Sequence, residues 1–152
     1  MILYIDNREP KNIINYLNEI NNNLLKIEIK SLDIGDYILY DEKKEENLII
    51  IERKTLSDLE SSIKDGRYNE QSFRLSSMLI PNHNIYYLIE GNIMNYKNNK
   101  ILYSAITSLS YFKGFSILNT INNIGTCDMI YSICSIYLKF LVFKSRILFG
   151  QF

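Results

Sequence analysis

Residues that build cross-linked or zinc-stabilised frameworks are scarce in this 152-residue chain. It has two cysteines, Cys127 and Cys134, and one histidine, His83. So few cysteines exclude a disulfide framework and a cysteine-rich zinc module. The two cysteines are spaced to lie on one face of a helix, where we expect buried free thiols. We expect His83, which lies between two asparagines after a proline, to be a surface residue.

An excess of charge of either sign is also missing. Seventeen basic and seventeen acidic side chains give a formal net charge of zero. A global basic field is therefore excluded, and any contact with nucleic acid must come from local clusters. The first residues lack a basic start and an apolar run, which excludes a signal peptide. The longest apolar stretch, 129–143, is interrupted by Lys139 and is too short to span a bilayer. We expect a soluble intracellular protein that does not bind a membrane.

What is present is an ordinary globular composition, with 47% hydrophobic and 22% charged residues, enough for one domain with a core. The apolar run 48–51 is typical of a central strand covered on both faces. Strand-like and helix-like segments interleave, which predicts an α/β fold with a central mixed β-sheet flanked by helices. We expect strands over 1–5, 24–32, 36–40, 48–52, 85–89 and 116–119, and helices over 11–19, 55–64, 68–79, 102–112 and 128–144.

Charged residues follow the apolar run directly, as Glu52-Arg53-Lys54. Because a strand alternates its faces, Glu52 and Lys54 should project to one side and Arg53 to the other. Charges at the end of a buried strand are costly unless they pair or bind something. A carboxylate and an ammonium group on one face fit metal-assisted hydrolysis, with Glu52 as a Mg²⁺ ligand and Lys54 stabilising a hydroxide or the phosphorane charge.

A second carboxylate is needed to hold the metal, and Asp36 is the natural candidate. The segments 36–40 and 48–52 can pair as a hairpin around the loop at 43–44. Residues whose numbers add up to about 88 then lie opposite each other, which places Asp36 opposite Glu52. The alternative is a surface salt-bridge network, which explains any one of these residues better than catalysis does. Taken together with Gly35 and Asp58, the convergence of several strand ends favours a site.

These residues resemble the catalytic domain of the XPF and crossover-junction (MUS-type) structure-specific endonucleases. The resemblance covers about residues 1 to 140, and its most specific parts are the patterns E-R-K-x-x-x-D and D-G-R-[YF]-x-E-Q. The matching segments are Asp6-Asn7-Arg8-Glu9, Gly35-Asp36-Tyr37, Glu52-Arg53-Lys54 with Asp58, Asp65-Gly66-Arg67-Tyr68-Asn69-Glu70-Gln71 and Arg74-Leu75.

The resemblance implies a restriction-endonuclease-like core and Mg²⁺- or Mn²⁺-dependent cleavage of branched DNA, such as 3′ flaps, forks and nicked junctions. By position, Asp36 and Glu52 match the metal carboxylates and Lys54 the catalytic lysine. Two further acidic residues, Asp6 and Glu9, match the first acidic motif, and Asp6 joins the expected metal ligands. The remaining signature residues, Arg53 and Asp58, would support catalysis or orient the DNA.

Some of these residues also have an explanation from local structure that does not depend on the resemblance. Arg53 faces away from Glu52 and Lys54, so we expect an ion pair with Asp58 or Asp6. Asp58 falls in the first turn of a helix, where a carboxylate stabilises the helix dipole without any catalytic role. The polar stripe of Arg67, Gln71 and Arg74 on the next helix is expected to contact DNA phosphates, together with Arg8, although a solvated helix face has the same pattern.

The expected organisation is a nuclease domain over residues 1–144 and a short tail over 145–152, without the helix-hairpin-helix module of many relatives. The final helix is apolar nearly all round, which predicts a homodimer or heterodimer through segments 102–112 and 128–143. Two other functions remain open: a non-catalytic DNA-binding or scaffold subunit of a heterodimeric nuclease, and a nuclease acting on duplex DNA. Action on DNA would place the protein in the nucleus or at a site of replication in a eukaryotic or viral setting, and otherwise in the cytoplasm.

Overall fold

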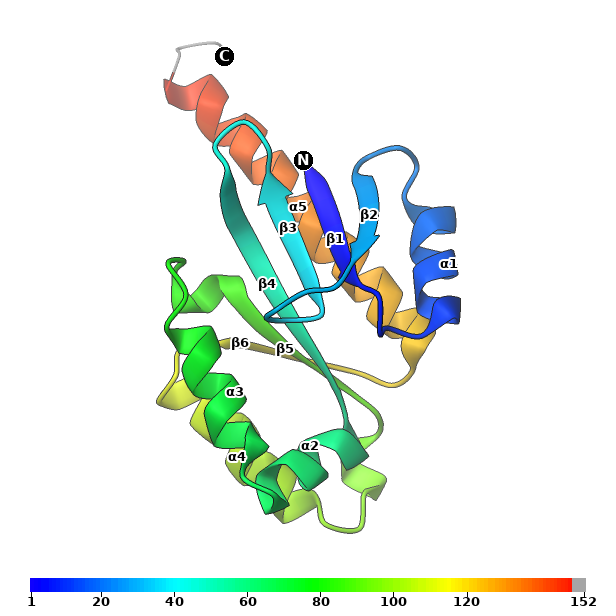
Figure 1. Cartoon of the computed structure of the whole chain (residues 1–152), viewed down its shortest axis with the longest axis vertical. Coiled ribbons are helices and arrows are strands. Elements are labelled where there is room, and N and C mark those ends of the chain that lie inside the picture. The colour runs from blue at the N-terminus through cyan, green and yellow to red at the C-terminus, as the bar shows by residue number, and fades with distance from the viewer. Residues whose placement is uncertain (149–152) are drawn as a thin grey trace.

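Six strands form one mixed sheet within residues 1–148, the part of the chain that the computed structural model describes (Figure 1). Their order is β2-β1-β3-β4-β5-β6. Strand β3 is antiparallel to both of its neighbours, and the other neighbouring pairs are parallel, as predicted for a mixed sheet. The strands are β1 (Ile2–Asp6), β2 (Lys26–Lys30), β3 (Tyr37–Asp41), β4 (Glu46–Thr55), β5 (Ile85–Glu90) and β6 (Ser116–Thr120).

Helices cover both faces of the sheet, and the sheet separates the hydrophobic core into two parts. On one face, α1 and α5 pack over β1, β3 and β4; on the other, α2, α3 and α4 pack over β4 and β5 (Figure 1). Two short 3₁₀ turns flank β5. The helices are α1 (Lys11–Ile20), α2 (Leu56–Lys64), α3 (Arg67–Ser76), α4 (Asn99–Tyr111) and α5 (Asn123–Leu148).

Strand β4 is the central element and is longer than the predicted segment 48–52. It spans Glu46–Thr55 and leads directly into α2. Its apolar stretch Leu48–Ile51 is buried, as predicted for a strand covered on both faces. The strand continues past this stretch because β5 pairs with it up to Thr55. Glu52, Arg53 and Lys54 therefore lie on a regular strand, and their side chains alternate between the faces.

The register of the β3–β4 hairpin confirms the predicted pairing. Tyr37 lies opposite Ile51, and a bulge shifts the register only beyond Leu39. Directly before β3, the backbone amide of Asp36 donates to the carbonyl of Ile51 (2.8 Å), which keeps Asp36 beside β4. Gly35 has φ +69°, and a Cβ atom there would lie 2.6 Å from Ile50 Cγ2. Glycine is therefore required at position 35, where the chain passes close to β4 just before Asp36.

Helix α5 corrects two of the expectations. It runs over 26 residues, so the predicted tail begins inside this helix; residues 149–152 lie outside the described part of the chain. By length and composition alone, α5 could also cross a membrane, in contrast to the shorter run expected from the sequence. Its inner face, with Cys127, Ile130 and Cys134, is nevertheless buried against the sheet. The helix is therefore part of the domain core over its N-terminal half, and both thiols are buried as expected.

Candidate active site

A polar cavity of about 310 Å³ opens where β4 leaves the core. It lies on the side of the sheet covered by α2, α3 and α4, and its wall comes from the turn after β1, the loop before β3, β4 itself and α3. Most of the predicted site residues meet here. The lining residues are Arg8, Asp33, Ile34, Gly35, Asp36, Glu52, Lys54, Gln71, Arg74 and Leu75.

Asp36, Glu52 and Lys54 share this cavity. Lys54 Nζ lies 3.0 Å from Glu52 Oε1, so both side chains project to the same side as predicted. Asp36 Oδ2 accepts a hydrogen bond from the backbone amide of Arg53 (2.7 Å), which ties the carboxylate to the same strand. Burial, together with the negative charge of Glu52, raises the pKa of Asp36 to about 8. Two neighbouring carboxylates that resist ionising together are stabilised by a cation between them.

The donor atoms of the cavity fit a hard divalent cation. Asp36 and Glu52 offer carboxylate oxygens, and the buried side-chain oxygen of Gln71 has no hydrogen-bond partner in the described chain. No group of three or more His, Cys, Asp or Glu side chains suited to a metal occurs within residues 1–148. A site with two carboxylates suits Mg²⁺ or Mn²⁺, since Mg²⁺ keeps several of its waters and needs few protein ligands.

Asp6 differs from its predicted role as a metal ligand. Its side chain is fully buried, and it is not among the residues that line the cavity. Arg8 holds the carboxylate through Nε and Nη2, at 2.7 and 2.9 Å. Mainly through these hydrogen bonds, Arg8 lowers the pKa of Asp6 to about 2. Asp6 is thus ionised and neutralised by Arg8, which argues against the predicted metal contact.

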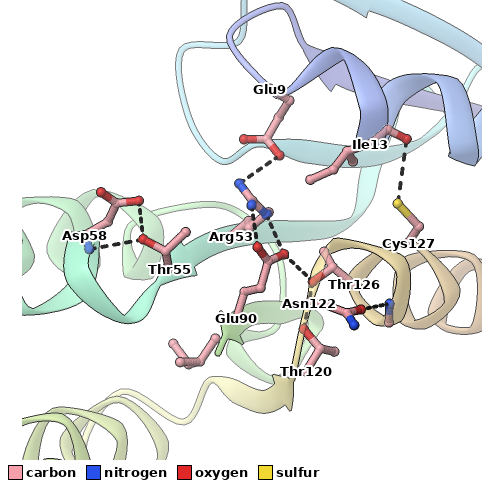
Figure 2. A network of polar contacts seen from close by, with 12 residues as sticks. Glu9, Ile13, Arg53, Thr55, Asp58, Glu90, Thr120, Asn122, Thr126 and Cys127 are labelled. Atoms are coloured by element: carbon pink, nitrogen blue, oxygen red, sulfur yellow. Dashed lines mark hydrogen bonds and ion pairs between the residues drawn. The ribbon is translucent and has the colours of Figure 1, made fainter. Parts of the chain in front are cut away.

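Arg53 lies on the opposite face of β4, in a closed ionic network (Figure 2). Its guanidinium group donates to both carboxylate oxygens of Glu90, at 2.7 and 3.0 Å, and lies 3.7 Å from Glu9 Oε2. The predicted partners Asp58 and Asp6 were therefore wrong. Glu90 ends β5, which pairs with β4 so that Thr55 lies opposite Glu90. This adjacency brings the carboxylate to Arg53 and could not be read before the two strands were paired.

The same network includes Glu9 and extends to α5. Glu9 accepts a hydrogen bond from the hydroxyl of Tyr37, and burial raises the pKa of Glu9. Glu90 accepts a hydrogen bond from Thr126 Oγ1 (2.6 Å), at the start of α5 (Figure 2). Glu9 therefore belongs to the closed face and not to the cavity. No role in this network was predicted for Glu90 from the sequence; its signals were a carboxylate at the end of a buried strand and a weak match to the family over residues 87–91.

Asp58 has the contacts of a helix cap. Thr55 Oγ1 accepts from the backbone amide of Asp58 (3.2 Å) and donates to its carboxylate (2.6 Å) (Figure 2). Thr55 is therefore the N-cap of α2. Asp58 is exposed and is not among the residues lining the cavity of the described chain. Its supporting role in catalysis stays a prediction.

The predicted polar stripe on α3 is divided between the cavity and the surface. Gln71 and Arg74 line the cavity, and Arg74 Nη2 donates to the carbonyl of Asp33 (2.7 Å). Arg67 is paired instead with Asp65 at the start of α3, at 2.7 Å. The cavity thus receives two of the three stripe residues and also Arg8 from the turn after β1.

The family model described as "ERCC4 domain" matches residues 5–133, most of the chain. The chain belongs to the ERCC4 domain family. It is 45% identical over 102 residues, 62% of its length, to the "Probable crossover junction endonuclease mus81" of Dictyostelium discoideum. It spans 11% of the length of that relative, and 21% of the Aspergillus fumigatus crossover junction endonuclease mus81. The motifs that gave the resemblance therefore identify the family correctly.

Solved structures agree with this assignment. "XPF from Aeropyrum pernix" is similar with a TM-score of 0.75 and 27% identity, covering 99% of this chain and 73% of that one. The same protein in "complex with DNA" gives a TM-score of 0.74 and 30% identity, covering 91% of this chain and 65% of that one. The six-stranded mixed sheet with helices on both faces confirms the predicted restriction-endonuclease-like core.

Proposed function

We propose that this ERCC4 domain is a Mg²⁺- or Mn²⁺-dependent endonuclease that hydrolyses phosphodiesters in branched DNA, such as 3′ flaps, forks and nicked junctions. One observation supports this most directly: Asp36, directly before β3, and Glu52, on the neighbouring strand β4, share a polar cavity with the amine of Lys54. The similarity to crossover junction endonucleases and to XPF in complex with DNA supports the same substrate class.

The residues of the cavity divide the chemistry between them. Asp36 and Glu52 would hold the metal ion, with the side-chain oxygen of Gln71 available to a ligand or to a bound water. The metal supplies Lewis-acid activation of the phosphate and of the attacking water. Lys54, held at 3.0 Å by Glu52, would hold the attacking hydroxide or offset the charge that develops on the phosphorane.

DNA contacts would come from the basic side chains at this opening. Arg8 and Arg74 line the cavity. Arg67 is exposed at the start of α3, the helix that also carries Arg74. Such side chains bind phosphates and position the strand without reading its sequence. Because the chain has no net charge, we expect weak binding that decreases with salt.

A labelled 3′ flap tests this function when it is incubated with Mg²⁺, Mn²⁺ or a chelator and compared with intact duplex. We expect cleavage of the flap that requires the metal and is lost in Asp36→Asn and Lys54→Ala. Equal product from the wild type and both variants would contradict the assignment. Equal cleavage of intact duplex would instead favour the duplex nuclease among the alternatives.

A scaffold subunit is the second candidate function. The intact Glu52-Arg53-Lys54 motif and the cation-ready cavity count against it, because a scaffold has no need of either. Binding of the flap without cleavage in any metal, by protein that binds Mn²⁺ normally, would favour the scaffold.

We also propose that the domain forms a homodimer, or a heterodimer with a related chain, through α4 and α5. Apolar side chains are exposed along both helices, and the C-terminal turns of α5 extend past the β3–β4 hairpin (Figure 1). An apolar-walled groove of about 670 Å³ lies between α4 and β6. Sedimentation that shows only a 17.9 kDa monomer at every concentration would contradict this proposal. The exposed members are Ile101, Tyr103, Tyr111 and Phe112 near α4, and Ile124, Ile136, Phe140, Val142, Phe143, Ile147 and Leu148 on α5.

Action on DNA places the proposed nuclease inside the cell, in the nucleus or at a site of replication in a eukaryotic or viral setting and otherwise in the cytoplasm. This localisation follows from the proposed substrate alone. A fluorescent fusion of the full chain would test it by its overlap with a DNA stain.

A further inference from the structure

Hydrogen bonds from the protein occupy both carboxylate oxygens of Asp6. Oδ1 accepts from the backbone amide and from Nε of Arg8, at 2.8 and 2.7 Å. Oδ2 accepts from Nη2 of Arg8 and from the backbone amide of Leu32, at 2.9 and 2.8 Å. Four hydrogen bonds fill the lone-pair sites that an ionised carboxylate offers. Asp6 therefore acts on Arg8 and on the loop at Leu32.

Nε and Nη2 of Arg8 bond to Asp6, while most of the Arg8 side chain is exposed. Its side chain is 73% exposed although its partner Asp6 is fully buried, and it lines the catalytic cavity. A further hydrogen bond runs from Nη2 to the carbonyl of Leu32 (3.2 Å). A guanidinium group fixed by a two-pronged carboxylate contact loses little freedom when it binds a second anion. The anchoring by Asp6 thus prepares Arg8 for a ligand in the cavity.

A second arginine holds the same loop. Arg74 Nη2 donates to the carbonyl of Asp33, the residue after Leu32. Both guanidinium groups therefore border one short segment that leads through Gly35 to the metal carboxylate Asp36. Two arginine side chains, each hydrogen-bonded to this segment, therefore form a basic edge of the cavity beside Asp36 and Glu52.

The charges of the cavity indicate what this edge binds. Its lining contains three basic side chains and three acidic ones, and the buried carboxylate of Asp6 behind Arg8 adds a fourth negative charge when all of these groups are ionised. Adding one divalent cation then leaves a formal excess of one positive charge, which suits a phosphodiester. The basic members are Arg8, Lys54 and Arg74, and the acidic members are Asp33, Asp36 and Glu52.

We propose that Asp6 is a positioning residue that presents Arg8 to a phosphate of the DNA strand in the cavity, and that it acts through Arg8 and not through the metal. The proposal rests on the endonuclease function above, and it assigns the first acidic motif to substrate binding. Asp6 and Arg8 should then behave as one unit towards DNA, while Asp36 alone of the aspartates compared should be needed for the metal.

The test combines a double-mutant cycle with direct metal binding. Asp6→Asn, Arg8→Ala and their combination are compared for flap-cleavage kinetics, for flap affinity by fluorescence anisotropy, and for Mn²⁺ binding by calorimetry. We expect each single variant to raise KM and weaken the flap affinity roughly tenfold or more, and the combination to be no weaker than the weaker single variant. Mn²⁺ affinity should stay at the wild-type value in all three and be lost in Asp36→Asn.

Loss of Mn²⁺ binding in Asp6→Asn, to the extent seen in Asp36→Asn, would overturn the proposal, as would additive effects on flap affinity. Asp6 is buried, so its substitution also tests folding; Arg8→Lys is the second variant and leaves Asp6 in place. Measured below the thermal midpoint of the variant, flap binding should be weaker and Mn²⁺ affinity unchanged, because an ammonium group lacks the forked geometry. Unchanged flap affinity in Arg8→Lys and Arg8→Ala would also overturn the proposal. If the wild type binds the flap without cleaving it, the nuclease function fails while affinity and Mn²⁺ binding still decide the role of Asp6.

Discussion

At the C-terminal end of β4, charged side chains line an open cavity on one face and form a closed ionic network on the other. On the face covered by α2, α3 and α4, Glu52 and Lys54 meet Asp36 in an open cavity. On the face covered by α1 and α5, Arg53 is enclosed by Glu90 and Glu9. Three consecutive residues of one strand thus serve two different purposes, because a strand sends alternate side chains to opposite faces.

The difference lies in whether the charges are already satisfied. On the closed face, Arg53 donates two hydrogen bonds to one carboxylate and has a second carboxylate nearby, so the network needs no further ligand. On the open face, Asp36 and Glu52 both line the cavity. Burial and the charge of Glu52 make ionisation of Asp36 unfavourable, which raises its pKa. We therefore expect the open face to bind a cation and the closed face to stabilise β4. Different substitutions can test these two roles.

The largest expected effect is loss of catalysis on the open face. Glu52→Gln removes a metal ligand while it keeps the shape of the side chain, so we expect the cleavage rate to fall on the order of 10³-fold or more. The thermal midpoint should change by only a few degrees. Single-turnover cleavage of a 3′ flap and thermal unfolding measure the two quantities.

Glu46→Gln is the matched control, because it makes the same change at the exposed, opposite end of β4. It should cleave at the wild-type rate. A Glu52→Gln variant that cleaves as fast as this control would contradict the assignment of Glu52 to the metal.

The second effect is loss of stability on the closed face. Glu90→Ala leaves Arg53, of which only 11% is exposed, with Glu9 as its remaining carboxylate partner at 3.7 Å. Breaking a buried ion pair in this way should lower the free energy of unfolding by about 3–5 kcal/mol. Denaturation in urea measures the change.

The exposed pair of Lys44 and Glu46 provides the comparison for this change. Its side chains are 60% and 52% exposed, so Glu46→Ala should cost about 0–1 kcal/mol. Similar losses in Glu90→Ala and Glu46→Ala would show that the closed network contributes no more than a surface pair.

The third effect is a pH dependence that belongs to the open face. The pKa of Asp36 is raised by burial and by Glu52 from 3.8 to about 8 in the folded protein, so the folded state binds the proton more tightly. Stability from this group is therefore fully present below the unfolded pKa and is lost as the pH rises towards about 8. In metal-free buffer, the thermal midpoint of the wild type should decline relative to Asp36→Asn over that range.

Addition of Mg²⁺ at pH 8 should raise the midpoint of the wild type and leave that of Asp36→Asn unchanged, because a ligand that binds the folded state stabilises it. Parallel midpoint curves for the two proteins without metal, or equal shifts with Mg²⁺, would argue against an unsatisfied carboxylate pair.

The smallest effect concerns the junction where β4 becomes α2. Thr55→Ala removes the side-chain cap of α2 and should cost about 1 kcal/mol of unfolding free energy. Thr107→Ala in the middle of α4 is the control, since that hydroxyl bonds only to a carbonyl one turn earlier and caps nothing. Equal effects of the two changes, measured in urea, would show that the cap at this junction is unimportant.

Local features of the site were predictable from the sequence. The apolar stretch before Glu52 marked a buried strand, and its alternation placed Glu52 and Lys54 on one side. The hairpin arithmetic placed Asp36 opposite Glu52; the register of β3 and β4 follows it at the adjacent pair Tyr37 and Ile51, and both carboxylates line the cavity. These features depend on the period of a strand and the length of one loop, which are short-range properties of the chain.

Partners that come from distant segments were not predictable in the same way. Arg53 was expected to pair with Asp58 or Asp6, whereas its partners are Glu90 and Glu9. Asp6 was expected at the metal, whereas Arg8 occupies its carboxylate. In both cases several acidic residues were available, and the spacing of the sequence did not rank them.

Motifs and strand period were sufficient to predict the family, the α/β class, the central strand and the two carboxylates that come together beside one hairpin. The charges that lie in the cavity, those enclosed on the opposite face of β4 and the length of α5 became known from the folded chain. The physical reason is range: strand alternation and hairpin register are set by neighbouring residues, whereas the partner of a buried charge depends on which strand ends and helices the whole sheet brings together.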